Sequence, residues 1–93
     1  ETRFDLTLVL IDRLMARLAR TGATGTAPPA ILPDEAALLA RLAPDMAAGR
    51  AWADLAADLT SRARRGRAVN LDPAALILDM CLRIGSTAEA LPL

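Results

Sequence analysis

NLDPAALILDMCLRI, residues 70–84, is the stretch from which the architecture of this chain is best inferred, because it predicts a capped helix with an unusually apolar surface. Asp72 is a typical N-cap residue, and Pro73 suits the first helical position, where its missing N–H is not needed. Gly85 is expected to end the helix in the left-handed conformation. Local chemistry therefore predicts both ends of the helix.

The apolar residues of this helix sweep about two thirds of its circumference at a step of roughly 100° per residue. Such a helix needs cover on several sides, either from the other helices of a bundle or from a neighbouring subunit, and periodicity leaves both alternatives open. We expect Leu78 and Leu82, beside the polar stripe of Asp79 and Arg83, to face a neighbour. The face assigned to the domain's own core consists of Leu76, Ile77, Met80, Cys81 and Ile84.

The beginning of the chain predicts a long amphipathic helix followed by a loop. Apolar side chains recur there at spacings of three and four, and arginines occupy the opposite side. Residues 21–33 contain two Gly, three Pro and three Thr, a composition typical of a flexible connector. The predicted buried face comprises Phe4, Leu8, Ile11, Met15 and Leu18, widened by Leu10 and Leu14, and the solvent side carries Arg13, Arg17 and Arg20.

Two more helices complete the prediction. Asp45 can cap the longer one, Trp52 lies on its apolar stripe and is assigned to the core, and Gly66 is its expected stop. The tail from Ser86 onward is expected to be loosely held. The predicted fold is all-α, a compact bundle of about four helices at approximately residues 3–20, 34–43, 46–65 and 72–84.

Length and composition limit the function. The 93 residues form one small helical domain, 1–93, which we interpret as a processed product or an excised piece of a longer protein because its first residue is Glu1. Eleven arginines balance eleven acidic residues, so no global basic charge points to nucleic acid. No apolar run reaches the ~18 residues of a membrane span and no secretory signal is recognisable, which favours a cytoplasmic location and no membrane partner.

The inventory of reactive groups is short. The chain has no His, no Tyr and no Lys, and its single thiol, Cys81, lies in mid-helix among apolar residues. Nothing predicts a zinc site, a phosphate-binding loop or a catalytic nucleophile with its base. We therefore predict no enzyme, no catalytic residue, no metal, no cofactor and no small-molecule substrate.

One charge cluster stands out in the sequence SRARRGR, residues 61–67. Its arginines could contact phosphate, bringing the domain close to DNA, or an acidic partner. Alternatively, they complement the dipole of the helix C-terminus and cover its last carbonyl groups, which is the interpretation we favour. The cluster consists of Arg62, Arg64, Arg65 and Arg67.

A family resemblance adds to these observations. The string VNLDP at residues 69–73, followed by a helix with Leu76, Ile77, Asp79, Leu82, Arg83 and Ile84, resembles the end of the delta-prime subunits of the bacterial DNA polymerase III clamp loader. RARRGRAVN, residues 62–70, and the helix containing Trp52 look like the alphaproteobacterial branch of that family. The similarity is strongest over residues 50–84.

The resemblance implies that the chain is a C-terminal fragment of a longer protein, namely its collar domain. Collar domains join the subunits of a five-membered ring that loads the sliding clamp in DNA replication. The implied partners are gamma or tau and delta subunits, and the parent complex would resemble DNA polymerase III, a DNA-directed DNA polymerase with an ATP-driven loader. Collars of the family have about five helices, whereas four are counted here. The alternative is an unrelated helical adaptor or homodimerisation module. In the collar interpretation, the interface residues are Leu78, Leu82, Asp79 and Arg83 together with the arginine cluster.

Overall fold

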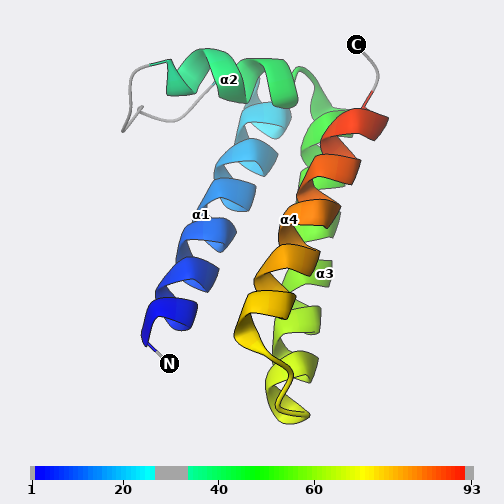
Figure 1. Cartoon of the computed structure of the whole chain (residues 1–93). Coiled ribbons are helices and arrows are strands. Elements are labelled where there is room, and N and C mark those ends of the chain that lie inside the picture. Colours follow the sequence, from blue (N-terminus) through cyan, green and yellow to red (C-terminus); the bar gives the residue numbers. More distant parts are fainter. Residues whose placement is uncertain (1, 27–33, 92–93) are drawn as a thin grey trace.

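The computed structural model describes residues 2–26 and 34–91, and this part of the chain folds into four helices. They are α1 (Thr2–Thr24), α2 (Glu35–Leu42), α3 (Met46–Ala68) and α4 (Pro73–Ala90). The three long helices lie side by side, α3 running opposite to α1 and α4, while the short α2 crosses one end of the bundle (Figure 1). The predicted all-α bundle of four helices is confirmed.

Glycine does not end the long helices where the sequence predicts. Helix α3 continues through Gly66 to Ala68, and α4 continues through Gly85 to Ala90. Both predicted stops are wrong, as is the predicted loop over residues 21–24, which belong to α1. Residues 27–33 of that loop lie outside the described residues. Helix α1 ends instead before Gly25, which has a left-handed φ of 75° and donates its N–H to the Thr21 carbonyl at 2.9 Å.

The turn that terminates α3 after Ala68 contains an asparagine in the left-handed conformation. Asn70 has a φ of 58°, its N–H donates to the Arg67 carbonyl at 3.2 Å, and the Leu71 N–H donates to the Gly66 carbonyl at 2.9 Å. These two bonds form a Schellman motif, in which asparagine tolerates the left-handed position. The Asp72 carboxylate then accepts a hydrogen bond from the Ala75 N–H at 3.3 Å, which confirms Asp72 as the N-cap of α4. The resulting tight turn makes α3 and α4 antiparallel neighbours.

The core is centred on Trp52, which is completely buried, as predicted. Its indole N–H donates to the carbonyl of Leu42 at 2.8 Å and so joins α3 to the end of α2. At the start of α3, the Asp45 carboxylate accepts the Ala48 N–H at 2.8 Å, which confirms the predicted cap. The largest side chains fully buried with Trp52 are Met15, Leu18 and Leu39.

Helix α1 buries a narrower face than predicted. Phe4, Met15 and Leu18 are buried, but Leu10 and Leu14 are exposed. The prediction that Arg17 lies on the solvent side is also wrong, because its guanidinium contacts the Glu35 carboxylate at 2.8 Å and links α1 to α2.

Helix α3, rather than α4, occupies the middle of the bundle, because α1 and α4 each pack mainly on it. Leu76 and Met80 of α4 are buried and Ile77 and Ile84 are partly buried, but Cys81 is exposed. Cys81 was therefore wrongly assigned to the core, since α4 is covered on one side only. The expected loose tail is wrong as well: α4 continues past Ser86, and its later turns still pack on the core through Ala88, with Leu91 just beyond the helix.

Candidate functional site

The two leucines of α4 that the sequence assigns to a partner lie on the open side of the bundle. Leu78 is 61 % exposed and Leu82 is 65 % exposed, one helical turn apart. Leu71, immediately before the helix, is also more than half exposed, and Ala75 is exposed between them. We call these four residues the α4 stripe. It consists of Leu71, Ala75, Leu78 and Leu82.

The spacing of the α4 stripe is four, three and four residues, the repeat by which helices pack along a narrow apolar seam. Leu71 and Ala75 were not assigned to this surface from the sequence. The signal was present in their spacing, but Leu71 precedes the N-cap Asp72 and so lies outside the predicted helix. Gly85 and Glu89 continue the same repeat and are also exposed. The apolar part of this line therefore ends at Leu82, about midway along α4.

A chain of ion pairs borders the α4 stripe on the side of α3. The Asp79 carboxylate accepts a hydrogen bond from Arg83 Nε at 3.1 Å, and Arg62 Nη1 lies 4.0 Å from the same carboxylate. Arg62 Nε also donates to Asp58 at 2.8 Å. These contacts are partly exposed, so each contributes little to stability, but together they align α3 with α4.

The arginines of this chain of ion pairs change the pKa of the Asp58 carboxyl. The hydrogen bond from Arg62 lowers the pKa of the Asp58 carboxyl below its ordinary value and outweighs the opposing effect of desolvation. The positive charges of Arg62, Arg83 and Arg65 act in the same direction as the hydrogen bond.

The four arginines of the predicted cluster do not share one surface. Arg62 and Arg65 border α4, whereas Arg64 and Arg67 border a groove on the side of α1. This division follows from a step of about 100° per residue, which places residues three apart on one side of a helix. A single phosphate site formed by all four side chains is therefore absent from the folded domain.

Arg67 already has partners within the domain. Its guanidinium forms an ion pair with Asp5 near the start of α1, and its central carbon lies 5.2 Å from the centroid of the Phe4 ring. This is a cation–π geometry. Arg65 and Arg67 also lie in the last turn of α3, where positive charge is favourable.

A second apolar stripe lies on α1. Leu6 and Leu10 are each more than half exposed and Leu14 is 38 % exposed, at a regular spacing of four residues. We call these three residues the α1 stripe. The two stripes lie on different helices, and α1 and α4 each pack mainly on α3.

Over residues 2–26 and 34–91, no group of acidic, cysteine or histidine side chains is arranged to hold a metal ion. None of the helices in this part of the chain combines the length and apolarity needed to cross a bilayer. No known family model matches the sequence, and searches of curated proteins and of solved structures find no significant match.

Proposed function

We propose that this domain is an assembly module that joins subunits of a larger complex through its apolar stripes, in the manner of the collar of a bacterial clamp loader. The observation that carries the proposal is the pair Leu78 and Leu82, both more than 60 % exposed on one side of α4. Full burial of a leucine contributes about 1.5–3 kcal/mol, so a helix packed on both would gain substantially.

The spacing of the α4 stripe specifies the kind of partner. A repeat of four and three residues fits the side of another helix better than a flat surface or an extended strand. Gly85, which continues the repeat, has nothing within 4 Å of where a Cβ would lie, so it leaves room for another backbone to approach. The expected partner surface is thus an amphipathic helix aligned along α4.

The charges beside the stripe would set the orientation of that partner. Asp79 and Arg83 are paired with each other at the border of α4 and remain partly exposed. Charged groups at the rim of an interface affect partner choice and association rate more than affinity. A neighbouring helix with acidic and basic residues in the complementary order would be preferred over one with the reverse order.

The existence of two stripes supports a ring rather than a simple pair. In a closed ring, every subunit uses one surface for the neighbour on one side and a different surface for the other. The α1 stripe and the α4 stripe, which lie on different helices, offer two exposed apolar surfaces for these two contacts. A twofold homodimer would need only one of them.

The test is reconstitution with gamma or tau and delta subunits of an alphaproteobacterial clamp loader, analysed by size-exclusion chromatography with light scattering. We expect the domain to co-elute with at least one combination of these subunits. Leu78→Ser with Leu82→Ser should abolish co-elution, whereas Met46→Ser, which replaces another strongly exposed apolar residue, should not.

Two results would contradict the collar proposal. One is failure of the domain to co-elute in any combination. The other is a stable dimer of the isolated domain that is dispersed by the Leu78 and Leu82 substitutions, which would assign the α4 stripe to self-association. Thermal unfolding of each variant shows whether the substitutions act on the interface alone.

A further inference from the structure

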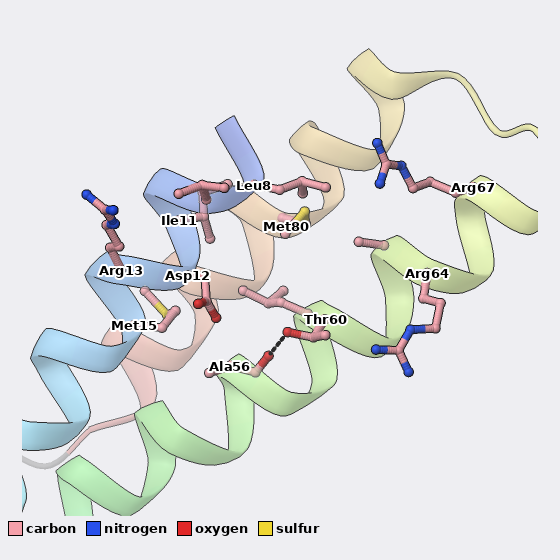
Figure 2. A pocket seen from close by; sticks show the side chains of 13 residues that line it. Leu8, Ile11, Asp12, Arg13, Met15, Ala56, Thr60, Arg64, Arg67 and Met80 are labelled. Carbon is pink, nitrogen blue, oxygen red and sulfur yellow. Dashed lines mark hydrogen bonds between the residues drawn. The ribbon is translucent and has the colours of Figure 1, made fainter. Parts of the chain in front are cut away.

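The charged side chains of α1 are divided between two sides of the helix. Asp5 forms an ion pair with Arg67 of α3, and the Asp12 carboxylate points into the space between α1 and α3 (Figure 2). The Arg13 side chain extends away from α3 (Figure 2). The acidic side chains of α1 therefore lie on the side of the helix that faces α3.

The α1 stripe lies among the basic side chains. Each of its leucines has an arginine three positions away, and residues at this separation are neighbours on the surface of a helix. No acidic residue of α1 is three or four positions from any of these leucines. The α1 stripe is therefore an apolar seam bordered by positive charge. The three arginines are Arg3 beside Leu6, Arg13 beside Leu10 and Arg17 beside Leu14.

Two of these three arginines have no acidic partner in the folded domain. Arg17 is paired with Glu35 of α2 at 2.8 Å. Arg3 and Arg13 are exposed, and no acidic group within residues 2–26 and 34–91 forms an ion pair with either of them. Charged groups at the border of an interface select partners of complementary potential. The border of the α1 stripe thus favours a partner with negative charge beside its own apolar residues.

Helix α2 limits the shape of what can lie against the α1 stripe. Arg17 follows Leu10 by seven positions and so lies on the same side of α1, where its contact with Glu35 brings the start of α2. The start of α2 projects sideways beyond α1 (Figure 1). A flat surface such as a bilayer would meet α2 before it reached all three leucines. A partner helix can instead lie along α1 and end at α2.

We propose that the α1 stripe binds an acidic amphipathic helix, whose apolar residues pack on the three leucines and whose Asp or Glu side chains pair with Arg3 and Arg13. This inference rests on the assembly function proposed above, and it assigns the acidic helix to the neighbouring subunit that does not contact α4. From Arg3 to Arg17, α1 spans roughly 21 Å at 1.5 Å per residue, so the contact extends over about four turns of the partner helix.

Two synthetic peptides of about 20 residues, long enough to form helices by themselves, test the chemistry of the partner. Both carry leucines at alternating spacings of three and four residues, with glutamates beside the leucines in one peptide and lysines in the other. In amide NMR spectra of the domain, we expect the glutamate peptide to cause saturable shifts at residues 3–14 and none at residues 78–82. The lysine peptide should bind more weakly. Binding of the lysine peptide that is equal or tighter, or shifts on α4 instead of α1, would overturn the proposal.

Two matched variants test the border charges. Arg13→Gln should weaken binding of the glutamate peptide by about threefold, the size expected for one exposed ion pair. Arg20→Gln removes the same charge from α1 at an exposed position that is not three or four residues from a leucine of the stripe, and should leave binding unchanged. Equal losses in the two variants would contradict pairing at Arg13.

Reconstitution with the clamp-loader subunits separates this inference from the collar proposal. We expect Leu6→Ser with Leu10→Ser to lose one neighbour and to keep the neighbour held by α4. If the domain co-elutes but this variant loses no neighbour, the inference fails and the collar proposal remains. If the domain never co-elutes but binds the glutamate peptide on α1, the collar proposal fails and the acidic-helix site remains.

Two other occupants of the α1 stripe are tested with the same variant. A dimer of the isolated domain that Leu6→Ser with Leu10→Ser disperses would assign the stripe to a second copy of the chain. Binding to phosphatidylglycerol vesicles that this variant abolishes would assign the stripe to an anionic membrane. Either result would overturn the inference.

Discussion

Gly22 of α1 and Gly49 of α3 meet backbone to backbone, and this contact fixes how closely the two helices approach. A Cβ on Gly22 would lie 2.4 Å from the Gly49 Cα and 2.6 Å from the Asp45 carbonyl oxygen. Main-chain atoms cannot move aside as a flexible side chain can. The absence of a side chain at Gly22 is therefore a requirement of packing, although glycine is unfavourable inside a helix.

Gly22→Ala should lower the free energy of unfolding by about 1–3 kcal/mol, the usual range for overpacking a tight contact. The better helix propensity of alanine, about 1 kcal/mol, opposes this loss only in part. Urea denaturation followed by circular dichroism measures the change.

The matched control is Gly85→Ala in α4. Gly85 is exposed within the helix, and nothing lies within 4 Å of its hypothetical Cβ. The same substitution should therefore raise the free energy of unfolding there by about 0.5–1 kcal/mol. Opposite signs at the two glycines are expected, and stabilisation at both would show that α1 and α3 do not meet at Gly22.

Gly66→Ala should have an intermediate effect that depends on Leu76. A Cβ at Gly66 would lie 2.5 and 2.8 Å from the two Leu76 methyl carbons, but this contact involves a side chain that can change its rotamer. We expect a loss of about 1 kcal/mol, measured by urea denaturation. In a Leu76→Ala background the loss should disappear, because the clashing methyl groups are absent. Additive effects in this double-mutant cycle would contradict the contact.

Trp52→Phe should destabilise the domain and loosen α2. The indole of Trp52 is fully buried, and its N–H is the donor to the Leu42 carbonyl. Phenylalanine keeps much of the apolar contact but leaves that acceptor without its donor, at a cost of about 1–3 kcal/mol. Hydrogen exchange should show faster exchange in α2 than in the centre of α3. An unchanged exchange pattern in α2 would mean that the hydrogen bond does not hold this helix.

The sequence predicts the number and approximate positions of the helices because their apolar periodicity and their caps are local features. Asp45 and Asp72 cap α3 and α4 as expected, and Trp52 is buried. The ends of the helices were harder to predict, because glycine occurs both where a helix ends and where a helix packs closely against a neighbour. Gly66 makes room for Leu76 instead of ending α3, and that use depends on a residue ten positions away.

The candidate sites depend to different extents on contacts between helices, which the sequence pattern of one helix does not report. Exposure of Leu78 and Leu82 could be inferred because they lie beside Asp79 and Arg83 on the same helix. The exposure of Cys81 could not be inferred, because periodicity reports how much of the surface of α4 is apolar but not how many helices cover it. The contacts between α1 and α3 were equally hidden, since they join Gly22 to Gly49 and Asp5 to Arg67 across more than twenty residues of sequence.

Asp58 should make stability depend on pH in the acid range. The hydrogen bond from Arg62 lowers the pKa of Asp58 in the folded state, so folding favours its charged form. The contribution of the ionised Asp58 carboxylate to folding stability is complete above the unfolded pKa of about 3.9. This contribution is lost as the pH falls through the lower pKa of the folded state. Asp58→Asn should therefore reduce stability at pH 6, measured by thermal unfolding. The difference in stability between the variant and the unsubstituted protein should become smaller as the pH approaches 3. A constant difference over this range would exclude the linkage.

Cys81 should react rapidly with a thiol reagent in the native protein. Its side chain is exposed on α4, near the α4 stripe, although its apolar neighbours in the sequence suggest the core. An exposed thiol reacts at a rate similar to that of the unfolded chain, whereas a buried thiol reacts only when the domain opens. With Ellman's reagent we expect a native rate within about tenfold of the rate in concentrated urea, allowing for local steric effects. A native rate that falls in proportion to stability across the Gly22→Ala and Gly85→Ala variants would instead place Cys81 in the core and rotate α4 away from the orientation described for Leu78 and Leu82.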